Sequence, residues 1–412
     1  MDLSLEFADL LSEGRRTGQR LKIPLSKLTN HVLLVGGSGS GKTHFARAML
    51  EELLSMKVPT IVVDSQGDLL WLTRVKVGRS AKQRRLVALK KKVFTPNCSD
   101  GFPFVIAPVL YSNTSGSNLQ LIRYWIRSVL RTIGHELRPG RTSPEEYQLT
   151  KISEEIMKSG GQLSLKTLLD KSRENSKTWP IHETVPIAEG NAKELVSGLG
   201  ALLGNERYLY DGKPFCIKEL ANSRTGALWI IYLAPLAIET RQLILNWVCE
   251  AIYHWMMNTS SVTISNRPRL VLFVDEAADY VTQANLPEYR QALFRLLNQG
   301  RKYGVSLMLA VQTPQDLPPE VRNNCAVKVF GAVDDPGDLD YVKYSTGLRS
   351  RDLAPLRDRS WKYAFLVRIP GMDPAFCRAR DLLTRKGRPL APRSSGMARI
   401  LKSLKQLRPV QY

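Results

Sequence analysis

The feature that most constrains the fold is a glycine-rich stretch, GGSGSGKT, at residues 36–43. It follows the apolar run HVLLV and precedes THFARAMLEELLSMK, whose apolar spacing predicts a helix. A loop of this composition between a strand and a helix lets backbone N–H groups surround a phosphate, and the helix N-terminus adds partial positive charge. The sequence therefore predicts an α/β chain that binds a nucleoside triphosphate.

The loop and the first helical turn hold the residues that we expect to contact this nucleotide. Lys42 is expected to bridge the β- and γ-phosphates, and the Thr43 hydroxyl is expected to take one coordination position on Mg²⁺. The predicted nucleotide-binding residues are Gly36, Gly37, Ser38, Gly39, Ser40, Gly41, Lys42 and Thr43. The alternative, a chance glycine-rich turn, is disfavoured by the strand and helix on either side.

A second apolar run, RLVLFVDEAADY, ends in a pair of acids. Asp275 is expected to bind Mg²⁺ through its water shell, and Glu276 is expected to act as the general base on the attacking water. Acids at a strand end can also cap a helix. The presence of the phosphate-binding loop in the same chain favours the catalytic interpretation.

Two further strand ends carry polar candidates. In VVDSQGDLL, Asp68 is expected at the carboxyl edge of the sheet, although an Asx turn explains the same residues. In GRKYGVSLMLAVQ, Gln312 ends a predicted strand, where an amide can sense the γ-phosphate or orient water, and a merely exposed strand end is the alternative. Arg301 and Lys302 precede that strand.

The charge balance indicates a polyanionic partner. Lys and Arg number 59 against 38 Asp and Glu, a formal net charge of +21, which draws nucleic acid; the alternative is a solvated basic surface. Residues 74–92 hold nine Lys or Arg and no acid, and residues 378–412 hold ten against Asp381 alone. The first segment reads as a basic amphipathic helix or hairpin for a membrane surface or a phosphate backbone, and we favour the backbone.

Cysteine usage and hydropathy predict a cytoplasmic protein that does not cross a membrane. The five cysteines are scattered and never form a Cys-x-x-Cys pair, which argues against a disulfide framework and a zinc site. No stretch approaches the ~20 apolar residues that span a bilayer. The N-terminus, MDLSLEFADLL, is acidic and unlike a signal peptide.

The order of apolar runs predicts one α/β core with a mainly parallel sheet, interrupted by a helical insertion. The predicted strands are 31–35, 60–64, 227–233, 269–275, 305–311, 326–331 and 362–368. The expected parts are an N-terminal segment 1–30, the first half of the core 31–114, the insertion 115–222, the second half of the core 223–370, and a basic C-terminal tail 371–412.

These motifs in this order resemble the HerA/FtsK superfamily of P-loop motor ATPases, and the HerA-like branch most closely. The likeness covers most of residues 20–370. It is carried by GGSGSGKT, VVDSQGDL, LFVDEA and, above all, GRKYGVSLMLAVQTPQDLPPEVRNNC. The last stretch distinguishes this superfamily from other P-loop proteins, because a P-loop alone occurs in proteins of many functions.

The resemblance implies a RecA-like core, a homo-oligomeric ring, expected to be a hexamer, and ATP-driven movement of double-stranded DNA. It implies phosphate and Mg²⁺ binding at Lys42 and Thr43, Asp275 and Glu276 as the acidic pair, Gln312 as the sensor and Arg301 as an arginine finger acting on a neighbour. An ordinary ion pair is the alternative for Arg301. Relatives in the superfamily also serve conjugation, secretion or antiviral defence, with a partner nuclease or other effector protein.

Three features depart from the family pattern. Asp68 stands where Glu is usual, which leaves open its role as a secondary acid, and Asn30-His31 stands where Arg is common. Only about 35 residues precede the P-loop, whereas full-length members carry an N-terminal β-barrel there. We therefore expect ring assembly or effector docking to be altered or supplied by another protein.

Overall fold

The computed structural model describes residues 3–76, 78, 80–96, 101–110, 115–138, 140–179, 185–223, 225–259, 267–281, 287–333, 335–358, 361 and 363–385. It divides into two compact units. The first comprises Met1–Phe94, Lys218–Cys249 and Ser261–Tyr412, and the second comprises Thr95–Ile217 and Glu250–Ser260. Residues 386–412 of the expected basic tail lie outside the described residues.

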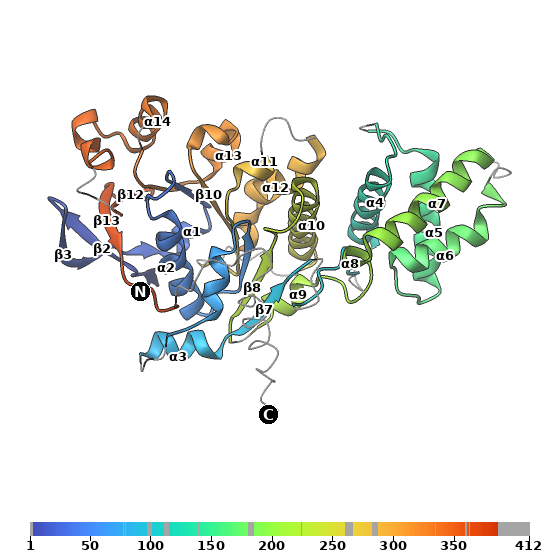
Figure 1. The fold of residues 1–412 in the computed structure, drawn as a ribbon, viewed down its shortest axis with the longest axis horizontal. Coiled ribbons are helices and arrows are strands. Elements are labelled where there is room, and N and C mark those ends of the chain that lie inside the picture. The colour runs from blue at the N-terminus through green and yellow to red at the C-terminus, as the bar shows by residue number, and fades with distance from the viewer. Residues whose placement is uncertain are drawn as a thin grey trace. The chain divides into compact units, whose positions relative to one another are not determined.

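The first unit is built on a sheet of 11 strands in the order β3-β2-β13-β12-β11-β5-β10-β9-β6-β8-β7 (Figure 1). Their bounds are β2 Ala8–Ser12, β3 Arg15–Arg20, β5 Val32–Val35, β6 Thr60–Asp64, β7 Lys90–Phe94, β8 Ala227–Tyr232, β9 Leu270–Val274, β10 Val305–Val311, β11 Val327–Phe330, β12 Phe365–Arg368 and β13 Ala375–Ala379. A separate antiparallel pair joins β1 (Ser4–Leu5) to β4 (Ile23–Pro24).

The strands from β11 to β7 are parallel, which confirms the predicted mainly parallel sheet. Each of the seven runs predicted as strands contains one. The structure adds an antiparallel extension in which β11, β12, β13, β2 and β3 pair in turn. β13 lies within the range that we expected to be the C-terminal tail, so part of that range belongs to the sheet.

Both faces of the parallel strands from β11 to β8 are buried, as their largely apolar sequences require, whereas the edge strand β7 begins with three lysines and is exposed at its start. On β5, Val32 and Leu34 join the core cluster that includes Phe45 and Met49 of α2 (Lys42–Ser55). Leu33 is fully buried although successive side chains point to opposite faces. Helices therefore have to cover both faces, and the loops at the strand ends remain open for a ligand.

The other helices assigned wholly or largely to the first unit are α1 Leu25–Leu28, α3 Ala81–Ala88, α9 Ile217–Ala221, α11 Ala278–Val281, α12 Pro287–Gln299, α13 Pro319–Asn324 and α14 Pro336–Thr346. α10 (Ile238–Met257) continues from the first unit into the second. The basic segment 74–92 contains α3 and the start of edge strand β7, rather than a hairpin. None of the helices in the described ranges is long and apolar enough to span a bilayer.

The second unit is helical, with α4 Ser115–Thr132, α5 Pro144–Lys158, α6 Leu165–Asn175, α7 Glu189–Asn205 and α8 Arg207–Tyr210. From α4 to α7 each helix contacts the next. The unit begins at Thr95, earlier than the insertion expected at 115–222. The physical reason is that Ile106 is held by the helices: its carbonyl accepts from Trp125 Nε1 at 3.0 Å, and its N–H donates to the Leu209 carbonyl at 2.7 Å.

The segment 380–385, which we call the C-terminal strap, is tied to α2 by a buried carboxylate. Glu51 is fully buried and accepts hydrogen bonds from Arg380 Nη1 at 2.8 Å and from the Leu383 N–H at 2.9 Å. It also accepts from the N–H and hydroxyl of Thr384 at 2.8 and 2.6 Å. The helix that follows the glycine-rich loop is thereby fixed to a segment more than 300 residues away in the sequence.

We expect Glu51→Ala to lower the free energy of unfolding by roughly 3–5 kcal/mol, because it removes one carboxylate partner of Arg380 and leaves the Leu383 and Thr384 N–H groups without their acceptor. Chemical denaturation would measure the loss. Asp340→Ala is the matched control, since Asp340 lies in α14 and forms an exposed ion pair with Lys343 at 2.8 Å. A loss no larger than that of the control would show that the strap is not anchored through Glu51.

Candidate nucleotide-binding site

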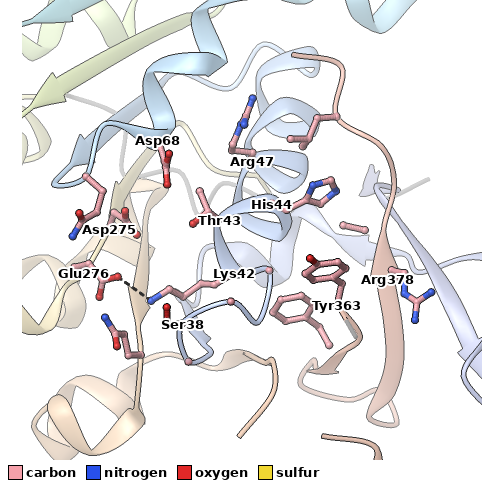
Figure 2. A pocket seen from close by; sticks show the side chains of 18 of the residues that line it. Ser38, Lys42, Thr43, His44, Arg47, Asp68, Asp275, Glu276, Tyr363 and Arg378 are labelled. Carbon is pink, nitrogen blue, oxygen red and sulfur yellow. Dashed lines mark hydrogen bonds and ion pairs between the residues drawn. The ribbon is translucent and has the colours of Figure 1, made fainter. Parts of the chain in front are cut away.

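A cavity of about 1000 Å³ lies where the parallel strands end (Figure 2). Of the residues predicted from the sequence, the ones that line it are Gly37, Ser38, Gly39, Gly41, Lys42, Thr43, Asp68, Asp275, Glu276 and Gln312. They follow β5, β6, β9 and β10, four neighbouring parallel strands, so their convergence comes directly from the sheet. Gly36, Ser40 and Arg301 are not among the lining residues.

The glycine-rich loop is shaped by its backbone. Gly39 and Gly41 have φ values of 77° and 92°, a left-handed conformation that other residues adopt only at a cost. Gly36 packs beneath the loop, because a Cβ added there would lie 2.6 Å from Ser40 Oγ. Gly36 and Ser40 therefore support the loop from below, and Gly37 and Gly39 have open space where a Cβ would stand.

The two acids at the end of β9 lie beside the loop lysine. Lys42 Nζ lies 3.2 Å from Glu276 Oε1, and both side chains are mostly buried (Figure 2). Burial raises the pKa of Asp275 to about 7, and repulsion from Asp64 and Glu276 adds to the effect, while Lys42 opposes it. This crowding of carboxylates favours a cation, and the Asp275 carboxylate and Thr43 hydroxyl on one cavity wall are oxygen ligands of the kind that Mg²⁺ takes.

Asp64 and Asp68, in the turn after β6, have different surroundings. Asp64 is fully buried, and its carboxylate accepts from the backbone N–H groups of Gln66, Gly67, Leu69 and Leu70. Burial raises the pKa of Asp64 to about 6, although these hydrogen bonds oppose the shift. Asp64 thus forms the turn that the sequence suggested, and the turn leaves Asp68 lining the cavity.

Arg301 lies at the opposite edge of the sheet from this cavity. It is exposed in the 3-10 turn Gly300–Tyr303, directly before β10, whereas Gln312 follows the same strand. β10 has 7 residues, so at ~3.3 Å per residue its ends are roughly 20 Å apart. Within the described ranges, no acidic side chain pairs with Arg301. Arg301 therefore stands apart from the cavity of its own chain.

Ten further residues line the cavity without having been predicted: Arg16, His44, Arg47, Gln66, Tyr363, Phe365, Arg378, Ala379, Asp381 and Leu382. His44 and Arg47 follow Thr43 on α2, so helical spacing could have indicated them. Most of the others come from β3, β12, β13 or the adjoining residues. β12 pairs with β13, and β2 with β3, close in the sequence, but β13 also pairs with β2, more than 350 residues away, and no local pattern in the sequence marks that pairing.

Comparison with known proteins identifies a matching family model and a curated relative. The family model described as "Helicase HerA, central domain" matches residues 10–252. The DNA double-strand break repair helicase HerA of Pyrococcus furiosus is 20% identical over 374 residues, which cover 82% of this chain and 63% of that protein. The chain therefore spans less than two thirds of the length of this relative.

Two solved structures share the fold. VirB4 of Thermoanaerobacter pseudethanolicus matches with a TM-score of 0.60 and 17% identity, covering 91% of this chain and 96% of that one. The plasmid coupling protein TrwB in complex with ADP and Mg²⁺ matches with a TM-score of 0.59 and 16% identity, covering 94% and 96%. The RecA-like fold is thus confirmed. With the family match extending over more than half of its length, and with the glycine-rich loop and acidic strand end meeting in one cavity, this chain belongs to the HerA family of P-loop ATPases.

Proposed function

We propose that this chain hydrolyses ATP in the presence of Mg²⁺ and uses the energy to move double-stranded DNA within a homo-oligomeric ring, for which six subunits are expected. The supporting observation is that two groups of residues expected to act on the same nucleotide lie far apart within one chain. The glycine-rich loop and the acids lie at one edge of the sheet, and Arg301 lies at the other. A complete site then needs two subunits.

Within one subunit, the chain's own groups bind and orient the triphosphate. Backbone N–H groups of the loop donate to the β-phosphate, and Lys42 moves from Glu276 to the β- and γ-phosphate oxygens. Thr43 and Asp275 are the residues that would hold Mg²⁺. When bound, Mg²⁺ offsets phosphate charge and so lowers the barrier to displacement.

Glu276 then takes the proton of the attacking water. It is suited to this task because its carboxylate lines the cavity and lies next to Lys42, which binds the phosphates. Gln312, at the end of the neighbouring strand, orients the water or senses the γ-phosphate. Asp68 contributes a further carboxylate to the same wall.

Arg301 acts on the nucleotide of the adjacent subunit. Its guanidinium is always charged and offers parallel donors to the phosphate oxygens in the transition state. The exposure of Arg301 and the absence of an acidic partner in the described part of the chain leave it available for such a contact.

The excess of basic residues supports DNA as the substance that is moved. Contacts to the phosphate backbone do not depend on base sequence, which a translocating motor requires. The segment 74–92 remains the described candidate for these contacts, and most of its basic side chains are exposed or half-buried.

We expect Glu276→Gln to reduce ATP turnover by roughly 10²–10⁴-fold while ATP still binds, because the base is lost and its shape is kept. ATP affinity should hold or rise, since the charge that competes for Lys42 is removed. Steady-state hydrolysis and calorimetric binding measure the two effects. Lys42→Ala is the contrasting variant and should lose binding. Turnover of Glu276→Gln within tenfold of the unchanged protein would reject Glu276 as the base.

We expect mixing to restore activity between two variants that are each inactive. Arg301→Ala subunits retain an intact cavity, and Glu276→Gln subunits retain Arg301, so a mixed ring contains interfaces with both groups. ATP hydrolysis is measured across mixing ratios, with ring formation checked by sedimentation. Lys302→Ala is the neighbouring control and should stay active alone. Mixed rings without any recovered activity would contradict action on the adjacent subunit.

We expect linear duplex DNA to raise the ATPase rate several-fold at low salt, and the stimulation to fall steeply as salt rises, because binding to phosphates releases counterions. Heparin at equal charge is the control for a mere polyanion effect. If intact rings hydrolyse ATP at the same rate with and without DNA, the translocase proposal is wrong. They would favour the alternative, a motor or regulatory ATPase of a conjugation, secretion or defence complex that acts with a partner effector.

A further inference from the structure

The cavity extends past the glycine-rich loop, away from the acids. Figure 2 shows Glu276 and Asp275 on one side of Lys42, and Tyr363 and Arg378 on the other. The cavity-lining residues from β12, β13 and the segments next to them are Tyr363, Phe365, Arg378, Ala379, Asp381 and Leu382. None of them has a part in the phosphate chemistry proposed above.

The direction of a bound triphosphate follows from the order of groups on α2. Hydrolysis requires the γ-phosphate beside Glu276, which Lys42 contacts. The α-phosphate, and whatever is attached to it, must then leave on the side of His44. The His44 ring lies there, with Nε2 at 3.0 Å from the Arg380 carbonyl of the C-terminal strap.

Tyr363 places an aromatic ring on this path. A Cβ added to Gly41 would lie 2.7 Å from Tyr363 Cδ1, so the ring rests against the backbone at the start of α2. The residue is still 48% exposed. Its backbone has a φ of 63°, a strained conformation for a tyrosine, and such strain persists where surrounding structure holds a side chain in a particular place.

Polar groups accompany the ring. Arg378 Nε is buried and has no hydrogen-bond partner within the described part of the chain, which is costly unless a ligand supplies an acceptor. Asp381, in the C-terminal strap, adds an exposed carboxylate that can accept from hydroxyl groups. An aromatic face with a guanidinium donor and a carboxylate acceptor matches a base joined to a ribose.

We propose that this half of the cavity is the nucleoside subsite, in which Tyr363 stacks on the purine base of ATP and Arg378 and Asp381 bind the ribose or the base edge. The proposal rests on the proposed ATP binding at the glycine-rich loop. It makes Tyr363 the residue that distinguishes a nucleotide from a bare polyphosphate.

The test compares two ligands by calorimetry: a non-hydrolysable ATP analogue, and inorganic tripolyphosphate, which lacks the nucleoside. We expect Tyr363→Ala to weaken the analogue by roughly tenfold or more, the loss expected for one base–aromatic stack, and to leave tripolyphosphate binding unchanged. Tyr363→Phe keeps the ring and should bind both ligands normally. Tyr344→Ala is the control, because Tyr344 is 85% exposed in α14 and does not line the cavity.

Each contrary outcome has a separate meaning. Equal affinities of Tyr363→Ala and the unchanged protein for the analogue would overturn the subsite. Equal weakening of both ligands would also overturn it, because Tyr363 would then act only by supporting the loop. If the unchanged protein binds neither ligand, the phosphate site itself fails, and the subsite fails with it.

Discussion

The buried carboxylate of Glu51 is the interaction on which the shape of the cavity depends. It lies on the helix that begins at the phosphate-binding loop, and it accepts four hydrogen bonds from the C-terminal strap. A carboxylate without water is tolerated only with such complete partnering. Because the strap also carries Asp381 and Leu382 into the cavity wall, one ionic anchor holds together residues from both ends of the first unit.

The two halves of the cavity are built by different parts of the sheet. The parallel strands β5, β6, β9 and β10 end at one edge and deliver the loop and the acids there. The antiparallel strands β12 and β13 continue from β11 and bring a second wall against the start of α2. Gly41 marks the line where the halves meet, since its missing side chain leaves room for the ring of Tyr363.

How much the sequence could predict differs between these halves. Apolar runs and the residues directly after them indicated the parallel strands, the loop, Asp275, Glu276 and Gln312, because each signal is local. Tyr363 and Arg378 belong to β12, β13 or the adjoining residues. β13 lies in the range expected to be a basic tail, and it also pairs with β2, more than 350 residues away, which no local pattern in either short strand indicates. The location of Arg301 at the far edge could also be predicted, because Arg301 directly precedes the strand that Gln312 follows.

Part of the positive charge lies on the two outermost strands of the sheet, β3 and β7. All six residues of β3 are exposed and three are arginine, and β7 opens with three lysines. The edge of an open sheet offers unpaired backbone groups to any approaching strand, and like charges on two such edges repel. Edge-to-edge pairing between the sheets of neighbouring chains is thereby disfavoured. Association of the chains is left to other surfaces.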